Sequence, residues 1–478
     1  MDFQVPDFSL VLPELFLLGM ACLLLLVDVF IDDAHRRVSF RIAQGTLLGT
    51  ALLTYMQMGG PEQIGFSGTF VRDDMGSVLK IAVLLATATG FLYARDYLRD
   101  RNLFRGEYYV LGLFAVLGMM VMVSAGSLLT IYLGLELLSL CLYALVAFDR
   151  ESGTSAEAAM KYFVLGALAS GMLLYGISMI YGATGSIDLE TIRAAIGERD
   201  AGNLVLVFGL VFLVVGVAFK LGAVPFHMWI PDVYQGAPTS VTLFVGSAPK
   251  LAAFALAMRL LVDGLENLQA DWQQMLIVLS VLSMGLGNLL AIAQTNIKRM
   301  LAYSTIANVG FLLLGLLAGT PEGYAAAMFY TITYVIMVCG AFGVVIYLSQ
   351  AGIEADSLDD FKGLNKRNPW LAMLMLLVMF STAGIPPLVG FYAKLAVLKA
   401  IIDVGLVWLA VAAVVFSIIG AFYYLRIVKL MYFDEPTNDA EIEGSLDTRV
   451  VLSANGLAVA VLGILPGWLL GICAAAIG

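Results

Sequence analysis

Apolar runs close to twenty residues long recur along the whole chain, and they limit its possible folds more than any other feature. The hydrocarbon core of a bilayer is about 30 Å thick, and roughly 20 apolar residues in an α-helix cross it. We therefore predict an all-α polytopic membrane protein with about 14 transmembrane helices. The predicted spans are 8–29, 39–57, 75–94, 107–124, 127–148, 161–182, 203–235, 240–262, 274–293, 299–318, 324–349, 370–402, 405–430 and 449–475.

The amino-acid composition excludes a water-soluble fold. Hydrophobic residues make up 61% of the chain and charged residues 13%, whereas about 25% of the residues in an ordinary soluble domain are charged. The net charge of -10 comes from acidic residues concentrated in the loops, and no basic cluster predicts nucleic-acid binding. We expect membrane lipids around the chain and no nucleic-acid partner.

The basic residues of the predicted loops and helix ends lie almost entirely on one side of the membrane. When successive loops are assigned to alternate sides, only Arg72, Arg193 and Arg199 fall on the poorer side. The positive-inside rule makes the basic side cytoplasmic, so both termini are predicted on the outer side.

Two runs, 203–235 and 370–402, are too long for one straight crossing. Each would form roughly 50 Å of helix at 1.5 Å per residue. Their interiors contain Leu-Gly-Ala-Val-Pro at 221–225 and Gly-Ile-Pro-Pro-Leu-Val-Gly at 384–390. Proline removes a helical hydrogen bond, and the freed backbone groups are tolerated at membrane depth only beside protein or trapped water. We predict discontinuous helices in spans seven and twelve.

These two discontinuous helices lie five spans apart and are predicted to run in opposite directions, which is typical of inverted repeats. One five-helix repeat would comprise spans four to eight and the other spans nine to thirteen. The predicted units are residues 1–106 with the first three spans, 107–262 and 263–430 as the two repeats, and 431–478 with a cytoplasmic loop and the last span.

The sequence shows no motif for binding a redox cofactor or a nucleotide. Cys22, Cys141, Cys339 and Cys473 are far apart within apolar runs, and His35 and His227 are the two histidines. Neither set has the spacing of a zinc, iron–sulfur or bis-histidine haem site. No GxGxxG follows a strand-like run, and no GxxxxGK[ST] is present. We expect this chain to bind no cofactor and no metal.

Ionisable residues inside the predicted spans are the candidates for function, because a charge at the bilayer centre costs at least about 2.5 kcal/mol. Lys80 and Arg259 lie near the outer ends of their spans and Lys399 lies late in span twelve, so we expect these three to reach the interface. A second group is too deep for that and comprises Glu136, Lys220, Lys250 and Lys394. Structural ion pairs between helices would be the alternative role for this group, but three lysines and one glutamate do not cancel.

A lysine beside Glu136 should keep its proton and an unpaired buried lysine should release it, so opening such a pair would act as a proton switch. The helix breaks are also expected to influence which lysine is charged. Lys220 near the end of its first half-helix is expected to be favoured as a cation, and Lys394 near the start of its second half-helix to be disfavoured. Replacement of Lys394 by Glu should then alter transport.

Three further residues each have two possible roles. Glu157 and Lys161 are one helical turn apart, which fits either a proton entrance toward Lys220 or an ordinary surface pair. His227 could relay protons near neutral pH or simply pack beside Trp229. The hydroxyls of Tyr132, Tyr143, Ser139, Ser304 and Thr305 are assigned no role, since packing hydroxyls are common in membrane helices.

Three segments of the chain resemble the antiporter-like subunits of bacterial respiratory complex I, the proton-pumping NADH:quinone oxidoreductase, whose fold is related to that of Mrp antiporters. They are GLELLSLCLY at 134–143, FKLGAVPFHMWIPDVYQGAPT at 219–239 and STAGIPPLVGFYAK at 381–394. The form PDVYQGAP and the lysine at position 250 are similar to one of the three sister subunit types in that family. The resemblance covers essentially the whole chain.

The resemblance implies a fourteen-helix fold with two inverted repeats and roles for individual residues. Glu136 and Lys220 would be the coupled pair, Lys250 the central relay and Lys394 the outlet, with Lys161 and Glu157 in support. Where repeat symmetry would place a lysine opposite Lys220, this chain has Ser381, so the two half-channels are expected to differ in chemistry.

The resemblance also implies location and partners. The chain would be a multi-pass protein of the bacterial inner membrane, assembled with sister antiporter-like subunits, while NADH, FMN, iron–sulfur clusters and quinone bind to other subunits. A subunit of a multi-subunit Na+/H+ antiporter is an alternative, although the mostly lysine set would repel Na+. A membrane scaffold that does not transport is a second alternative.

Overall fold

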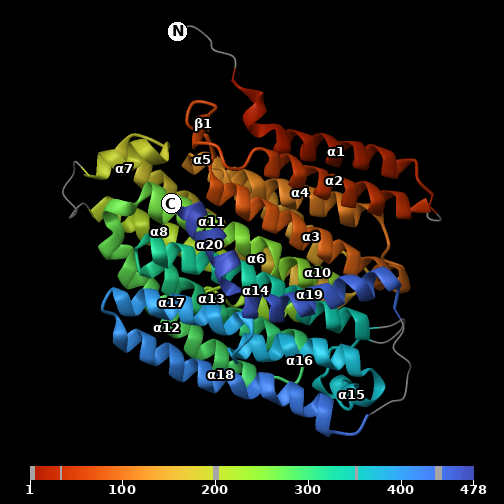
Figure 1. The fold of residues 1–478 in the computed structure, drawn as a ribbon. Coiled ribbons are helices and arrows are strands. Elements are labelled where there is room, and N and C mark those ends of the chain that lie inside the picture. The colour runs from red at the N-terminus through yellow and green to blue at the C-terminus, as the bar shows by residue number, and fades with distance from the viewer. Residues whose placement is uncertain (1–5, 33–34, 198–203, 350–353, 437–443) are drawn as a thin grey trace.

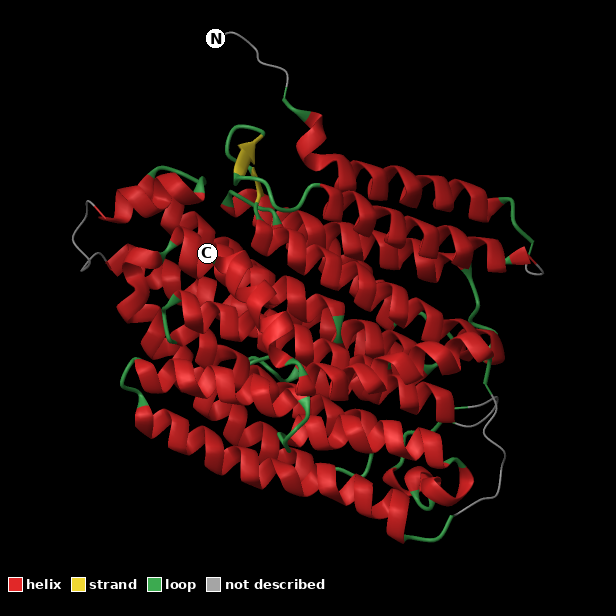
Figure 2. Ribbon diagram, in the orientation of Figure 1, coloured by secondary structure: helices red, strands yellow, loops and turns green. Residues whose placement is uncertain are grey.

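The computed structural model describes residues 6–32, 35–197, 204–349, 354–436 and 444–478, and shows a bundle of roughly parallel helices (Figure 1). Helix accounts for nearly all of its regular structure, apart from one short hairpin of β1 (Gln63–Gly65) and β2 (Phe70–Arg72) (Figure 2). The main helices are α1 (Leu12–Val29), α2 (Arg37–Met56), α3 (Asp74–Asp100), α4 (Gly106–Val123), α5 (Leu128–Val146), α6 (Gly153–Thr184), α7 (Leu189–Gly197), α8 (Leu204–Leu221), α9 (Trp229–Gly236), α10 (Thr239–Gly246), α11 (Ala248–Ala257), α12 (Gln269–Ile292), α13 (Ile297–Leu317), α14 (Pro321–Leu348), α15 (Leu364–Arg367), α16 (Pro369–Ala383), α17 (Val389–Asp403), α18 (Val407–Phe433), α19 (Leu446–Ile464) and α20 (Pro466–Ile477).

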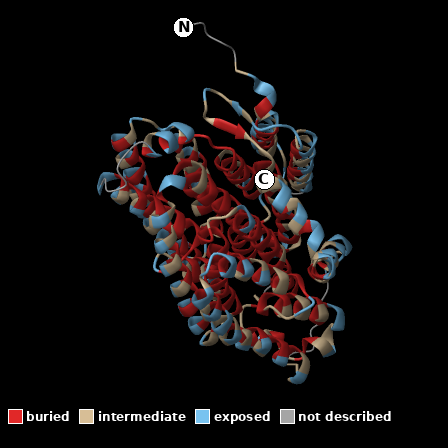
Figure 3. Ribbon diagram, turned by 60° about the vertical axis from the view of Figure 1, so that its left-hand side comes forward, coloured by how far each residue is buried: buried red, intermediate tan, exposed pale blue. Residues whose placement is uncertain are grey.

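The predicted polytopic fold is confirmed. Within the described residues, 12 helical stretches are long and apolar enough to cross a membrane. Two more predicted spans complete the set: α2, which begins with arginines, and the broken span made of α16 and α17. Many large apolar residues of the peripheral helices are exposed, and Figure 3 shows a buried interior with exposed and intermediate residues on the outside of the bundle.

Both predicted helix breaks are present, and both end in the same way. Helix α8 stops at Gly222 with φ +88°, and α16 stops at Gly384 with φ +90°. In each case the glycine and the residue after it donate their backbone N–H groups to one carbonyl, that of Ala218 or that of Phe380. This left-handed termination suits glycine, because a Cβ would be strained there. Aligning the two glycines places Pro225 opposite Pro387 and Thr382 opposite Lys220, one residue later than the expected Pro386 and Ser381.

The eighth span has a break that we did not predict. Ser247 separates α10 from α11 with φ -110° and ψ -96°, and the segment Met258–Gly264 continues as π-helix. The sequence signal was Pro249, which occupies the first turn of α11 as proline does at helix starts. We overlooked it because the run 240–262 has the length of a single span.

The ends of the helices are arranged as the alternate-loop assignment requires. Ion pairs near the basic end join Arg95 to Asp447 and, at 2.7 Å, Arg101 to Glu354. At the opposite end, Arg193 lies 3.5 Å from Glu266. The described terminal segments also lie at that opposite end, where Phe8 contacts Phe66 in the β-hairpin and Ile477 lines a cavity beside Asp73. Arg199 of the predicted outer side lies outside the described residues.

Helices α4 and α5 pack closely through two glycines, and this contact positions Glu136 on α5. A Cβ on Gly134 would lie 2.7 Å from the backbone N of Met122 and 2.8 Å from the carbonyl oxygen of Gly118. Backbone atoms cannot rotate away as a side chain can, so the two helices can approach this closely only with glycine at both positions.

Gly134→Ala is expected to destabilise the protein by about 1–3 kcal/mol, because the added methyl group forces α4 and α5 apart. Gly171→Ala is the matched control, since Gly171 lies on α6 with nothing within 4 Å of its would-be Cβ. The midpoint of thermal unfolding is measured for both variants in native membranes, with protease resistance as the readout. Equal unfolding midpoints would contradict the close-packing argument.

Candidate functional site

Lys220 and Glu136 lie near each other on α8 and α5 but are not in direct contact. Lys220 is 6% exposed, and its Nζ donates a 2.9 Å hydrogen bond to Ser139 Oγ, one turn after Glu136 on α5. A Glu136 oxygen accepts a short hydrogen bond from Ser170 Oγ on α6. Among the described residues no ion pair within 4.0 Å joins the two charges. Each member of the expected coupled pair therefore binds its own serine, Lys220 to Ser139 and Glu136 to Ser170.

A small cavity borders Lys220 and also Ser170, the hydrogen-bond partner of Glu136. It measures about 10 Å³ and is lined by Ser139, Ser170, Tyr143, Gly166 and Lys220, among others. A space of roughly 10–15 Å³ holds one water molecule when polar groups surround it. One water in this cavity would lie beside Lys220 and the Ser170 hydroxyl, which in turn binds Glu136, so a proton could move between the two charges without direct contact between them.

Lys250 reaches the break in span seven from α11. Its side chain is 2% exposed, its Nζ donates a 2.8 Å hydrogen bond to the carbonyl oxygen of Leu221, and the ammonium lies 5.3 Å from the ring centroid of Trp229. Leu221 is the last residue of α8, and the carbonyls of a helix's last turn have no partner within the helix. The ammonium supplies that partner and is stabilised by the negative end of the helix dipole.

Lys394 makes the equivalent contact in the second repeat. Its Nζ donates to the carbonyl oxygens of Thr382 at 3.0 Å and Ala383 at 3.1 Å, and to Ser417 Oγ at 2.9 Å. Ala383 is the last residue of α16, immediately before Gly384, as Leu221 immediately precedes Gly222. In both repeats, a buried lysine thus binds the final carbonyl of the half-helix that precedes the break.

This geometry corrects the predicted electrical bias. We expected Lys394 to be disfavoured as a cation because it follows the start of α17. Its side chain instead reaches back to the C-terminal end of α16, where a cation is stabilised. Lys220 lies in the last turn of α8 as expected, but its ammonium binds a serine hydroxyl and not a helix carbonyl.

Glu157 and Lys161 form the predicted one-turn pair at 2.8 Å, with side chains 66% and 44% exposed. Lys161 Nζ also lies 2.8 Å from Asp232 on α9, whose other oxygen lies 2.7 Å from Arg299 on α13. Asp232 therefore joins the two repeats near the basic end of the bundle. Sequence reasoning passed over Asp232, although it lies within the segment 219–239 that carried the resemblance.

His227 lies in the break between α8 and α9 and is half-buried. Its Nδ1 atom is enclosed and has no hydrogen-bond partner among the described residues. It makes no recorded contact with Lys220 or Lys250.

Lys298 is a further buried cation, which the sequence analysis did not predict because it placed this residue on the cytoplasmic side outside the spans. Lys298 is the second residue of α13 and 4% exposed, because α9 ends over it. Its Nζ donates a 2.9 Å hydrogen bond to the carbonyl oxygen of Ala237, the cap residue of α9, and lies 4.0 Å from Glu354. No local signal distinguishes this lysine from one in solvent.

Hydroxyl and amide groups follow α13 from Lys298 toward Lys394, and they include Ser304 and Thr305, to which the sequence analysis assigned no role. The recorded bonds join Ser304 to Tyr424 at 2.5 Å, Asn308 to Tyr330 at 2.7 Å and Thr305 to Tyr334 at 2.7 Å. A cavity of about 10 Å³ borders Ser304, Tyr334 and Thr382, the last of which binds Lys394 through its carbonyl.

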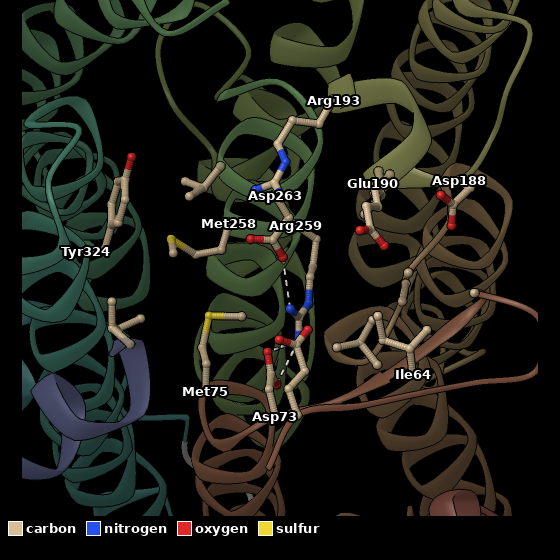
Figure 4. A pocket seen from close by; sticks show the side chains of 18 of the residues that line it. Ile64, Asp73, Met75, Asp188, Glu190, Arg193, Met258, Arg259, Asp263 and Tyr324 are labelled. Carbon is tan, nitrogen blue, oxygen red and sulfur yellow. Dashed lines mark hydrogen bonds and ion pairs between the residues drawn. The ribbon is translucent and has the colours of Figure 1, made fainter. Parts of the chain in front are cut away.

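Two of the three cations expected to reach the interface are instead paired inside the protein. Lys80 lies 2.5 Å from Glu14 of α1, with both side chains buried. Arg259 is held between Asp73 at 2.7 Å and Asp263 at 2.9 Å, as Figure 4 shows, beside an outer cavity of about 530 Å³. Lys399 is exposed, as expected. The paired cations are structural, whereas Lys220, Lys250 and Lys394 have no carboxylate within 4.0 Å among the described residues.

Comparisons with known proteins agree with this architecture. A family model described as NADH:quinone oxidoreductase/Mrp antiporter, transmembrane region, matches residues 125–420. NADH-quinone oxidoreductase subunit N from Thioalkalivibrio sulfidiphilus is 60% identical over 478 residues, which is 100% of either chain. A chain of respiratory complex I from Thermus thermophilus has a TM-score of 0.84 at 32% identity and covers 97% of this chain and 100% of its own. A chain of the Mrp complex from Dietzia sp. has a TM-score of 0.83 at 22% identity, covering 98% of this chain and 96% of its own, which shows the fold alone.

Ser139→Ala should destabilise the ammonium form of Lys220 by about 1.5–3 kcal/mol, the usual contribution of a hydrogen bond to a charged group. The nitrogen-15 resonance of the lysine side chain reports the fraction protonated at fixed pH. Ser178→Ala is the control, because Ser178 donates only to the Leu174 carbonyl of its own helix α6. An unchanged protonated fraction in Ser139→Ala would show that Ser139 does not hold the charge.

Proposed function

The chain belongs to the NADH:quinone oxidoreductase/Mrp antiporter family and is a relative of subunit N, and on that premise we propose that four ionisable side chains within the spans carry protons through it. It is a proton-translocating membrane subunit of NADH:quinone oxidoreductase, respiratory complex I. Glu136, Lys220, Lys250 and Lys394 form the relay. Protons pass from the cytoplasm to the periplasm, driven by quinone reduction in other subunits.

This proposal rests on the atoms that Lys220, Lys250 and Lys394 contact. Each lysine is buried at membrane depth and bound to neutral oxygen atoms, with no carboxylate within 4.0 Å among the described residues. A structural cation is neutralised, as Lys80 and Arg259 are. A lysine held only by carbonyl and hydroxyl oxygens can lose its proton without leaving a buried anion behind, so its protonation can change during turnover.

Lys220 is the switch in this proposal. Glu136 favours the charged form of Lys220, and movement of α5 or α6 alters that influence through Ser139 and Ser170. Lys250 is bound to the carbonyl of Leu221, the residue next to Lys220. Release of a proton from Lys220 therefore relieves repulsion at Lys250, and the charge advances toward the centre of the chain.

The second repeat supplies the outlet at Lys394. The bonded groups along α13 lead to the cavity beside Thr382 and thus to the Lys394 ammonium. Lys161, with Glu157 and Asp232, is the entrance from the basic end in this proposal, and Lys298 begins the α13 chain. His227 remains a lower-ranked relay candidate, because its Nδ1 atom has no hydrogen-bond partner among the described residues.

The remaining assignments also belong to the proposal. Residues 107–262 and 263–430 form the two repeats, with 1–106 before them and 431–478 after them. The chain crosses the bacterial inner membrane with both termini in the periplasm, beside sister antiporter-like subunits and lipids. NADH, FMN, iron–sulfur clusters and quinone are bound by other subunits. An Na+/H+ antiporter subunit shares the fold, but lysine-rich surroundings repel Na+.

Lys220→Ala should abolish most proton translocation per electron pair, while NADH oxidation slows because the two are coupled. Proton uptake and quinone reduction are measured separately in vesicles that contain the assembled complex. Lys399→Ala removes an exposed lysine from the second broken span and should leave both rates unchanged. Normal pumping in Lys220→Ala would favour a scaffold that does not transport.

Lys394→Glu should reduce pumping more than Lys394→Met does. A glutamate would place its carboxylate against the Thr382 and Ala383 carbonyls, where an anion is repelled by the helix end, whereas methionine only removes the hydrogen bonds. Proton uptake per NADH oxidised is compared between the wild type and the two variants in the same vesicles. Glutamate and methionine variants with equal pumping would argue against charge at this helix end.

A further inference from the structure

A basic pocket lies at the basic end of the bundle, where α2, α3 and the start of α19 meet, away from the proposed relay. Its volume is about 210 Å³, and its lining consists of Arg37, Phe40, Arg41, Arg95, Asp96, Arg99 and Ser445. Four guanidinium groups thus face a single carboxylate within the lining. That excess of positive charge is unusual for a cavity in a protein of net charge -10.

Two described carboxylates near this pocket, those of Asp96 and Asp447, are engaged by arginines of its lining. Asp96 lies 3.0 Å from Arg95 and 3.4 Å from Arg99, and Asp447 of α19 forms a short ion pair with Arg95. Arg37 and Arg41 make no ion pair with any described residue. One helical turn separates these two arginines on the outward face of α2, so they present their charge together. The pocket therefore has capacity for an anion.

The position of the pocket favours a lipid phosphate over a soluble anion. Along the face of α2 that carries Arg37 and Arg41, the next outward residues are Leu48 and Leu52, 54% and 59% exposed, followed by Tyr55 at 67%. This is the order of a lipid-facing helix, with charge at the headgroup level, aliphatic groups beside the acyl chains and an aromatic ring at the far interface. The arginines therefore lie where phospholipid phosphates lie.

A separate apolar groove lies along α3 further from the basic end, and it extends as far as Tyr55 at the other interface. It has a volume of about 450 Å³, and its end nearest the pocket is lined by Thr89, Ala86 and Leu85. Thr89 is six residues from Arg95, about 9 Å along the helix. One leaflet of hydrocarbon is roughly 15 Å deep, so an acyl chain that descends from the pocket enters this groove. The opposite wall comprises residues of α14, α19 and α20, which in Figure 1 run beside α3.

We propose that this pocket and groove bind one anionic phospholipid of the cytoplasmic leaflet, with its phosphate on Arg37, Arg41, Arg95 and Arg99 and one acyl chain against α3. The bound lipid fastens the N-terminal helices to α19 and α20 and supplements the ion pair between Arg95 and Asp447. Lipid recognition by clustered basic residues at the cytoplasmic membrane surface has this physical basis. The inference does not depend on the proton relay.

The test uses the assembled complex, purified and washed with excess phosphatidylcholine in detergent. Arg37→Gln/Arg41→Gln removes two charges from the pocket, and Arg150→Gln/Lys429→Gln removes two exposed charges from the same predicted side outside it. Lipids retained per complex are counted by mass spectrometry. We expect the pocket variant to lose about one phosphatidylglycerol per complex relative to the wild type and to the control.

A second measurement identifies the source of the phosphate. Thermal unfolding is compared in vesicles of phosphatidylcholine alone, in vesicles that also contain phosphatidylglycerol, and with inorganic phosphate added to phosphatidylcholine vesicles. Phosphatidylglycerol should raise the midpoint of the wild type and the control more than that of the pocket variant, and inorganic phosphate should have no such effect. The proposal would be overturned if the wild type, the control and the pocket variant retained equal amounts of lipid and showed equal shifts of the unfolding midpoint. If inorganic phosphate raised the midpoint as much as phosphatidylglycerol does, the pocket would be an anion site that does not bind lipid.

Discussion

A lysine ammonium at membrane depth must be surrounded by oxygen atoms, and the rest of this structure depends on how that need is met. Helix ends supply the oxygens, because the last carbonyls of a helix have no partner within it. At Leu221 and Ala383 the chain ends a half-helix, turns through a left-handed glycine and leaves its final carbonyl for Lys250 or Lys394. The break and the lysine stabilise each other, since either one alone would leave an unsatisfied polar group in hydrocarbon.

The same chemistry separates two kinds of buried cation. Lys80 and Arg259 are neutralised by carboxylates: the Lys80–Glu14 pair joins α3 to α1, and the Arg259–Asp73 pair joins the start of α3 to the segment after α11. Lys220, Lys250 and Lys394 bind only neutral oxygen atoms, so their charge stays available for exchange. Burial alone therefore does not identify a proton carrier in this protein. The identity of the atom that faces the ammonium does.

The two repeats use one design with different surroundings. Lys250 reaches its carbonyl from a neighbouring span that is itself broken at Ser247, whereas Lys394 reaches back within its own broken span. In the first repeat Lys220 and Glu136 each bind a serine, while the second repeat has a series of bonded hydroxyl and amide groups along α13. With Thr382 opposite Lys220, the two halves share a helix break and a lysine–carbonyl contact but differ in the polar groups around them.

The sequence by itself determined the number of spans, the breaks near Pro225 and Pro386, and the presence of Glu136, Lys220, Lys250 and Lys394 within the membrane. Hydropathy, proline and glycine act over a few consecutive residues, so these features can be read locally. Only the tertiary structure decided which atoms meet. The reach of Lys394 to Ala383, the serines that bind Glu136 and Lys220, and the burial of Lys298 under α9 depend on how helices distant in sequence pack, because a side chain's partner lies across a helix interface that no local pattern encodes.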